Sequence, residues 1–280
     1  MFTAMPGDRA RTLLAGTRFG AVEWVSETGS TNADALARGY DGAPEGLVLV
    51  ADHQTAGRGR RGRTWDAPPG ASLLLTVLLR PPTSVLGATT MATAVALAEA
   101  IEAVAGFAPG LKWPNDLVWP GDGSAPDRKL AGILAEAEWP VGSDIASGYR
   151  PPGPEEKAVV AVGVGLNVNW PSDRPAELAE LAVSINDVVG HEVEREELLA
   201  AFLARLDHHY ADLLARRAGS EVFAAWRARS ATLGRRVRVD LGADDIVGTA
   251  VDVSPEGHLV VELLEGGRRT FAVGDVVHLR

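Results

Sequence analysis

The sequence has 280 residues, 46% of them hydrophobic and 23% charged, which fits a soluble protein with one large domain and a small one. A formal net charge of −10 argues against a general nucleic-acid-binding protein, which usually needs a wide basic face. The absence of cysteine excludes disulfides, thiolate metal sites and a cysteine nucleophile. We recognise neither an apolar run of transmembrane length nor a signal peptide, so we expect a cytoplasmic protein.

The N-terminal part leads into a polar turn. Residues 1–20 hold at most one short helix, around residues 9–14, and a first strand is expected at residues 22–25. The run Ser30-Thr31-Asn32 then opens a helix, and all three residue types are preferred helix caps. A cap explains one of these side chains, so the others can present hydroxyl or amide groups to a ligand.

A glycine- and arginine-rich loop lies between two apolar strands, expected at residues 47–51 and 73–79. It carries four arginines and three glycines in Gly57-Arg58-Gly59-Arg60-Arg61-Gly62-Arg63, followed by Trp65. Neighbouring guanidiniums repel by roughly 0.6 kcal/mol at 7 Å in water, so the loop should stay mobile until an anion neutralises it. On its own, a glycine- and arginine-rich string is equally typical of a solvated linker, of a nucleic-acid contact or of an anion-binding loop. Its place between two core strands favours an anion-binding flap.

The middle of the chain places further polar residues at strand ends. A helix at residues 89–104 should end at Gly106, and the strand that follows stops at Pro114 because proline cannot donate to the ladder. Asn115 and Asp116 are left at this end. The pair is also ordinary turn chemistry, but a carboxylate beside a phosphate ligand can hold Mg²⁺.

Lysine and glycine mark the next two strands. Lys129 begins an apolar strand at residues 128–136; a lone lysine in this place is usually solvated, but here Gly132 follows it and permits close approach. The buried strand at residues 159–169 is interrupted by Gly163 and Gly165, a pattern typical of a ligand or backbone coming near. The polar loops 121–127 and 142–157 have no assigned role, and the second is expected to be an exposed hairpin tip or disordered.

The predicted secondary structure changes from helices to short strands in the C-terminal third of the chain. Amphipathic helices are expected at residues 194–217 and 221–229, and His208 and His209 in the first are interpreted as structural. From residue 231 onward, turn residues separate short strands, which predicts a small all-β barrel. Nothing in this barrel looks catalytic. Its expected strands are residues 235–241, 246–253, 259–264 and 269–273.

Five motifs, in this order, resemble those of the biotin protein ligases. They are Ser30-Thr31-Asn32, the segment from Gln54 to Arg63, Lys112-Trp113-Pro114-Asn115-Asp116, the segment from Lys129 to Leu134, and Gly163-Val164-Gly165-Leu166-Asn167. The resemblance implies an α+β fold. It comprises a short extension (1–20), a mixed-sheet catalytic domain of the biotin/lipoyl ligase type (21–230) and an SH3-like β-barrel (231–280).

The resemblance also implies a reaction and a set of site residues. Members of this family make biotinyl-5′-AMP from biotin and ATP with Mg²⁺, and pass the biotin to a lysine of a biotin carboxyl carrier protein of acetyl-CoA carboxylase. Lys129, Arg58 and Arg60 would be catalytic, and Asp116 would hold Mg²⁺. The biotin site would comprise Ser30, Thr31, Asn32, Gln54, Gly57, Arg58, Gly59, Arg60, Lys129, Gly132 and Gly163; the ATP and adenylate site would comprise Arg58, Arg60, Arg61, Arg63, Trp65, Asn115, Lys129 and Asn167.

Three alternatives remain open from the sequence. A lipoate–protein ligase shares the chemistry, although the hydrogen-bonding groups of Ser30, Thr31 and Gln54 suit the ureido ring of biotin better than an apolar ring. A biotin-responsive transcriptional regulator is disfavoured because only about twenty residues precede the first expected strand, so we expect no specific DNA binding. A non-catalytic phosphate-binding module would leave Lys129 and Asp116 unexplained. No membrane partner is expected.

Overall fold

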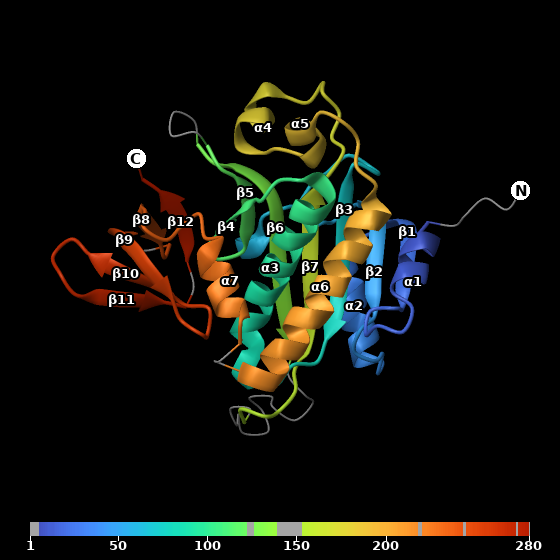
Figure 1. The fold of residues 1–280 in the computed structure, drawn as a ribbon, viewed down its shortest axis with the longest axis horizontal. Coiled ribbons are helices and arrows are strands. Elements are labelled where there is room, and N and C mark those ends of the chain that lie inside the picture. The colour runs from blue at the N-terminus through green and yellow to red at the C-terminus, as the bar shows by residue number, and fades with distance from the viewer. Residues whose placement is uncertain are drawn as a thin grey trace, which may run out of the picture.

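A seven-stranded mixed sheet forms the centre of the protein in the computed structural model (Figure 1). The structure describes residues 6–121, 126–138, 153–217, 220–242, 245–272 and 274–279, so most of the predicted hairpin tip at 142–157 lies outside it. Strands β1 and β2 pair in parallel, and every other neighbouring pair in the sheet is antiparallel. The spatial order is β1 (Val22–Thr28), β2 (Val48–Gln54), β3 (Ser72–Leu79), β7 (Val159–Asn167), β6 (Arg128–Glu138), β5 (Asp116–Trp119) and β4 (Gly110–Lys112).

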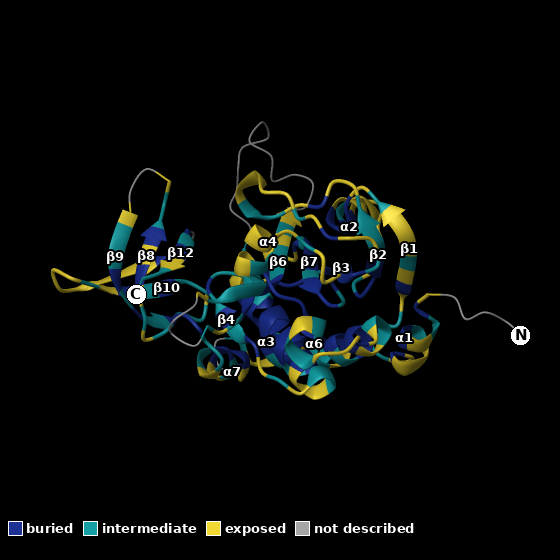
Figure 2. Ribbon diagram, turned by 90° about the horizontal axis from the view of Figure 1, so that it is seen from above, coloured by how far each residue is buried: buried dark blue, intermediate teal, exposed yellow. Residues whose placement is uncertain are grey.

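Helices cover both faces of this sheet. All eight residues of β3 are buried, because α3 and α6 lie on one face of the sheet and α2 on the other (Figure 2). Strands covered on both faces read as continuous apolar runs, which is why the sequence predicts β2 and β3 well. The helices are α1 (Asp8–Leu13), α2 (Thr31–Tyr40), α3 (Leu86–Ala105), α4 (Ala176–Leu181), α5 (Ile185–Val189), α6 (Arg195–Arg216) and α7 (Val222–Ala228), with 3₁₀ turns at Arg60–Gly62 and Thr83–Val85.

Helix α3 is the main core helix. It ends at Gly106, which takes the left-handed conformation at φ 76°, as the sequence predicts. By length and composition alone, the segment Thr83–Ala105 could cross a membrane, with mean hydropathy 1.5, so the expectation that no run is long enough is wrong for this helix. Within its most apolar window 72% is buried inside the fold, which identifies α3 as a core helix.

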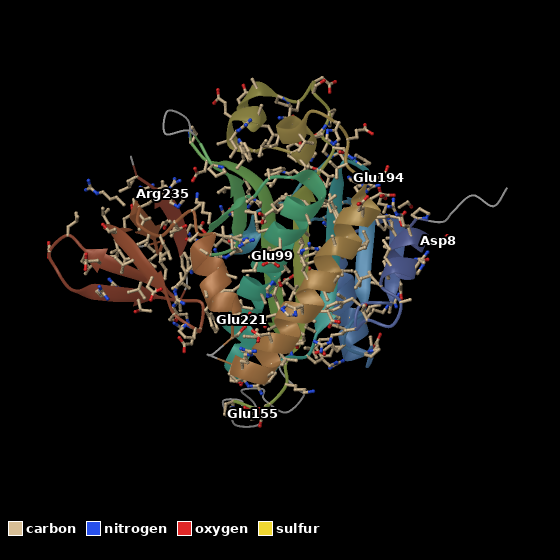
Figure 3. All side chains as sticks on the ribbon, viewed as in Figure 1. Asp8, Glu99, Glu155, Glu194, Glu221 and Arg235 are labelled. Carbon is tan, nitrogen blue, oxygen red and sulfur yellow. The ribbon has the colours of Figure 1, made fainter. Side chains whose placement is uncertain are left out.

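The contact between α3 and α6 includes a histidine beside a carboxylate. His209 on α6 is buried and places Nε2 2.8 Å from Oε2 of Glu99 on α3, whose position Figure 3 labels. This contact supports the structural interpretation of His209.

The C-terminal segment forms a separate five-stranded antiparallel sheet beside the edge strand β4 (Figure 1). Alternate residues such as Val237, Val239 and Val261 point into its small core, with no exposed surface. The sequence predicts four of its strands and misses the last, whose four residues carry too short a pattern. The order is β11 (Arg268–Phe271), β10 (Leu259–Leu263), β9 (Asp245–Val253), β8 (Arg236–Asp240) and β12 (Asp275–His278).

Candidate active site

One cavity with about 200 Å³ of free space gathers most of the predicted site residues. Its walls come from the turn before α2, the arginine loop, the β4–β5 hairpin, strands β6 and β7, and the first residues of β12. The lining residues are Ser30, Thr31, Asn32, Gln54, Arg58, Gly59, Arg60, Arg63, Thr64, Trp65, Leu75, Lys112, Trp113, Pro114, Asn115, Asp116, Lys129, Gly132, Ile133, Leu134, Gly163, Val164, Gly165, Asp275 and Val276.

Hydroxyl and amide groups make up one part of the wall. The backbone N–H of Thr31 donates to Oε1 of Gln54 at 2.8 Å, and the Thr31 hydroxyl donates to the same oxygen at 3.1 Å. These bonds leave the amide nitrogen of Gln54 free of a described partner at the cavity. Ser30 precedes the helix in extended conformation, and its side chain makes no cap hydrogen bond. The structure therefore fits the interpretation that this polar run does more than cap a helix.

Asn32 is occupied by the protein itself. Its amide nitrogen donates to the carbonyl of Leu134 at 3.1 Å and to Oε2 of Glu136 at 2.7 Å. Its Oδ1 lies 2.6 Å from the hydroxyl of Thr76. Asn32 is buried and lines the cavity, but both its amide protons and its oxygen are engaged by protein groups. A Cβ on Gly163 would come within 2.2 Å of the Asn32 Oδ1, so this glycine makes room for a side chain of the protein.

The indole ring of Trp65 lies over Gly132 and Gly165. A Cβ on Gly165 would come within 2.5 Å of its indole ring, and one on Gly132 within 2.9 Å. Lys129 Nζ lies 5.3 Å from a ring centroid of the indole, within the range of a cation–π contact. The indole N–H is buried and has no hydrogen-bond partner among the described residues, so the cavity wall contains an unused donor.

A second part of the wall, here called the cationic wall, contains Lys129 and the arginines Arg58, Arg60 and Arg63. Lys129 lies at its centre and contacts the β4–β5 hairpin through Asp116. Lys129 Nζ lies 2.8 Å from Oδ1 of Asp116, a buried oxygen that accepts no aligned hydrogen bond in the described structure and is held by charge attraction. Asn115 is fixed to β6: its amide nitrogen donates to the carbonyl of Ile133 at 2.7 Å, and its own carbonyl accepts the Ile133 N–H at 2.9 Å.

The arginine loop borders the cavity, and protein carboxylates lie beside its guanidinium groups. Arg58 donates to Oε1 of Glu136 at 3.1 Å. Arg60 donates to Oδ1 of Asn115 at 3.2 Å and to the carbonyl of Gly274 at 3.2 Å. Burial lowers the pKa of Arg60, while the carboxylates of Asp275 and Asp116 oppose this effect; a guanidinium stays charged throughout. The carboxylates of Glu136 and Asp275 thus offset part of the repulsion expected among the arginines.

Three predicted residues do not line the cavity. Gly57 packs against the carbonyl of Trp65, which a Cβ would approach to 2.3 Å. Arg61 points to the C-terminal sheet, where Nη1 lies 3.6 Å from Asp240. Asn167 is buried behind the wall and donates to the carbonyls of Lys129 and Val183 at 3.3 and 3.0 Å, so it supports Lys129 from behind. Their assignment to ligand binding remains a prediction.

Two carboxylates at the site, Glu136 and Asp275, were not predicted from the sequence. Glu136 accepts hydrogen bonds from both Asn32 and Arg58. It lies on β6 two residues after the end of the Lys129–Leu134 motif, and the alternation of a strand is the only pattern that its position shows in the sequence. Asp275 at the start of β12 lines the cavity and contacts three arginines of the loop. Nothing in the sequence of the C-terminal segment looked catalytic, yet Asp275 and Val276 of this sheet line the cavity.

The residues present fit Mg²⁺ only as a companion of phosphate. Among the described residues there is no group of three His, Asp or Glu side chains that could hold a metal. Asp116 supplies one carboxylate, and its Oδ1 already contacts Lys129. Mg²⁺ is commonly held by one or two carboxylates together with substrate phosphates, and Asp116 fits that pattern and no other.

Comparisons with known proteins match this architecture. Residues 25–142 match the biotin/lipoate A/B protein ligase family, and residues 232–279 match the biotin protein ligase C-terminal domain. The second match agrees with an SH3-like C-terminal sheet. Biotin–[acetyl-CoA-carboxylase] ligase of Mycobacterium tuberculosis is 37% identical over 281 residues, covering 97% of this chain and 94% of its own. The ligase of that name from Paracoccus denitrificans is 34% identical, covering 90% and 98%.

Two further matches complete the picture. The bifunctional ligase/repressor BirA of Bacillus subtilis is 30% identical, with 87% of this chain covered but 70% of the relative. Among solved structures, the biotin protein ligase of Aquifex aeolicus in complex with biotin and ATP is 26% identical, with a TM-score of 0.73 and coverage of 94% of this chain and all of that one.

Proposed function

Because this chain belongs to the biotin protein ligase family, we propose that its cavity joins biotin to AMP and then passes the biotin to a lysine of a carboxyl carrier protein. The proposal rests on one observation: hydrogen-bonding side chains and cationic side chains line the same cavity. Hydrogen-bonding side chains before α2 and at the end of β2 share it with Lys129 and the arginine loop.

The hydrogen-bonding wall suits the ureido ring of biotin. Such a ring needs both donors and acceptors. The free amide nitrogen of Gln54 can donate, the Ser30 hydroxyl can donate and accept, and the Thr31 hydroxyl, whose proton is directed to Gln54, can accept. A site built to hydrogen-bond a group rejects analogues that lack it, because its own polar groups are then left unpaired. We therefore propose biotin, rather than lipoate with its apolar ring, as the substrate.

The cationic wall suits the adenylation step. A carboxylate is a poor electrophile, so biotin must first be joined to the α-phosphate of ATP, with release of pyrophosphate. This step brings two anions together, and fixed cations at the point where charge develops lower its barrier. In this proposal Lys129, which contacts Asp116 and the Trp65 ring, meets the biotin carboxylate and the α-phosphate, and Arg58 and Arg60 line the same cavity. Mg²⁺ carried by ATP would add further charge neutralisation beside Asp116.

The loop and Trp65 protect the product. Biotinyl-5′-AMP is a mixed anhydride that water would hydrolyse, and a closed loop excludes water. The acceptor lysine of the carrier then attacks the acyl carbon, and AMP leaves. We also propose that the reaction takes place in the cytoplasm; the burial of α3 in the core supports an enzyme that is not held in a membrane.

A direct test is incubation of the protein with biotin, ATP, Mg²⁺ and a biotin carboxyl carrier domain, followed by intact mass spectrometry of the carrier. We expect the mass of the carrier to increase by one biotin in an ATP-dependent manner, and no increase when its acceptor lysine is replaced by arginine. ATP–pyrophosphate exchange with biotin and with lipoate in parallel separates the two ligase classes. Exchange that depends on lipoate alone would refute the proposed substrate.

A further inference from the structure

One carboxylate of the C-terminal sheet contacts three arginines of the loop. Asp275 Oδ2 lies 2.6 Å from Nη2 of Arg63 and 3.4 Å from Nη1 of Arg61, and Oδ1 lies 3.5 Å from Nη1 of Arg60. The preceding carbonyl, that of Gly274, accepts a hydrogen bond from Arg60 at 3.2 Å. The side chain of Asp275 is 25% exposed, so these charges are partly shielded from water.

The backbone conformation of Arg61 is a second indication that contacts with the C-terminal sheet hold the loop. Arg61 takes a left-handed conformation at φ 56°, which costs a residue other than glycine about 1 kcal/mol or more. This conformation directs its side chain to Asp275 and Asp240 on the C-terminal sheet. Strain of this kind persists where surrounding contacts hold it, and the contacts here come from another sheet.

Asp275 contacts the side chains of three arginines at once, so it can fix their positions without cancelling their total charge. Guanidiniums this close repel one another, and a shared carboxylate lowers that repulsion and fixes the position of their heads. Three guanidiniums against the two carboxylates of Asp275 and Asp240 still carry excess positive charge, so a phosphate group would meet a cationic wall. Asp275 lines the same cavity as Arg60 and Lys129.

We propose that Asp275 is a positioning residue for the nucleotide: it holds Arg60 and Arg63 at the cavity before ATP arrives. The inference rests on the proposed function of this cavity.

The test compares three full-length variants with the wild type. Asp275→Asn removes the charge at nearly constant shape, and Asp275→Glu keeps it. Asp245→Asn is the matched control, because Asp245 lies on the same sheet, pairs with Arg238 at 3.1 Å and makes no described contact with the loop. Two readouts are measured: the KM for ATP and kcat in biotin-dependent pyrophosphate exchange, and the rate of tryptic cleavage within Arg58–Arg63 in protein without ligand.

We expect Asp275→Asn to raise the KM for ATP by about tenfold or more, the loss of a hydrogen bond between charged groups, with a smaller change in kcat. Cleavage in the loop should accelerate while the rest of the chain stays resistant. Asp275→Glu should restore much of both properties, and Asp245→Asn should match the wild type. A KM for ATP that stays unchanged or falls in Asp275→Asn would overturn the inference. Absence of exchange in the wild type would instead refute the proposed function, and the cleavage rates would still decide whether Asp275 orders the loop.

Discussion

Lys129 has a fixed position because three parts of the chain hold it. Asp116 on β5 pairs with its ammonium group, Trp65 from the arginine loop lies against it, and Asn167 on β7 donates to its carbonyl. An ammonium group on a flexible stem is a poor catalyst when it moves freely, and these contacts supply the preorganisation that electrostatic catalysis needs.

At this scale we predict that Lys129→Ala abolishes adenylate formation in a folded protein. The variant removes the cation nearest the expected α-phosphate, and removal of one preorganised group of this kind costs about 10²–10³-fold in rate. The measurement is biotin-dependent pyrophosphate release, with circular dichroism and urea unfolding as controls for folding. Near-normal pyrophosphate release from a folded variant would show that Lys129 has no such role.

Single residues were predictable to different degrees. Arg58 and Arg60 could be singled out as clustered cations between two apolar strands, and Lys129 by the resemblance of its motif; all three line the cavity. Gly163 and Gly165 could be recognised as sites of close approach, but the approaching groups are Asn32 and Trp65, from distant segments of the chain. Asp275 could not be predicted, since a single aspartate after a glycine in a short strand resembles ordinary turn chemistry.

The arginine loop is the element that joins the two sheets. Arg60 donates to Asn115 of the β4–β5 hairpin and to Gly274 before β12, and hydrogen bonds from Gly59 to Arg63 and from Trp65 to Gly57 close the loop on itself. These contacts link the arginine loop to both the hairpin and the C-terminal sheet, and the sequence alone did not predict them.

We predict that Arg60→Gly allows the adenylate to escape. The variant removes a charged donor at the cavity and the contact that links hairpin, loop and C-terminal sheet, so the dissociation rate of biotinyl-5′-AMP should rise by about tenfold to 100-fold. Stopped-flow displacement of the preformed adenylate measures this rate. Arg61→Gly is the comparison: it removes the same charge from the same loop but outside the cavity, and should have the smaller effect. Equal rates in wild type and Arg60→Gly would contradict the assignment.

Elements were predictable where their patterns are long. The buried strands β2, β3 and β7 and the helices α3 and α6 could be located within a few residues, because each carries a sustained apolar run or stripe. Helices α4 and α5 and strands β5 and β12 have four to six residues each, too few for periodicity to show. Two of these missed strands, β5 and β12, supply Asp116 and Asp275 to the cavity.

On the scale of the whole molecule, the two sheets meet through a continuous hydrogen-bonded chain. The N–H of Trp113, in the cavity wall, donates to the hydroxyl of Thr232 at 3.0 Å, and that hydroxyl lies 3.1 Å from Nε2 of His278 on β12. Nδ1 of His278 lies 2.9 Å from Asp127, which also pairs with Arg235, labelled beside the junction in Figure 3. Such contacts join residues more than a hundred positions apart, so no local sequence pattern reveals them.

This junction makes the stability of the protein dependent on pH. Burial lowers the pKa of His278 below its ordinary value of 6.5; the Asp127 carboxylate opposes this and Lys112 and Arg235 add to it. His278 is therefore neutral in the folded state at pH 7, with Nδ1–H donating to Asp127 and Nε2 accepting from Thr232. For Asp127 itself, burial would raise the pKa, but the Gly121 N–H, His278 and Arg235 outweigh it and hold the pKa below 3.8.

The sign of the effect follows from which state binds the proton more readily. Unfolded His278 takes up a proton near pH 6.5, whereas folded His278 does so only at lower pH. Its contribution to stability is therefore complete above pH 6.5 and is lost as the pH falls from 6.5 through the folded pKa, by at most about 1.4 kcal/mol per pH unit for one proton. Asp127 acts in a separate window, because its contribution is lost only as the pH falls below 3.8.

We predict that His278→Gln, which keeps a donor and an acceptor but cannot titrate, flattens the decline in unfolding free energy between pH 6.5 and the folded pKa of His278. Urea unfolding at several pH values between 7.5 and 5 measures the slope, and exposed His191→Gln is the matched control that should keep the wild-type slope. If the wild type and His278→Gln lose stability equally over this range, the chain from Trp113 to Asp127 does not couple the two sheets to pH. A flatter slope in His278→Gln alone would place the titrating group at the contact that holds the C-terminal sheet against the cavity wall.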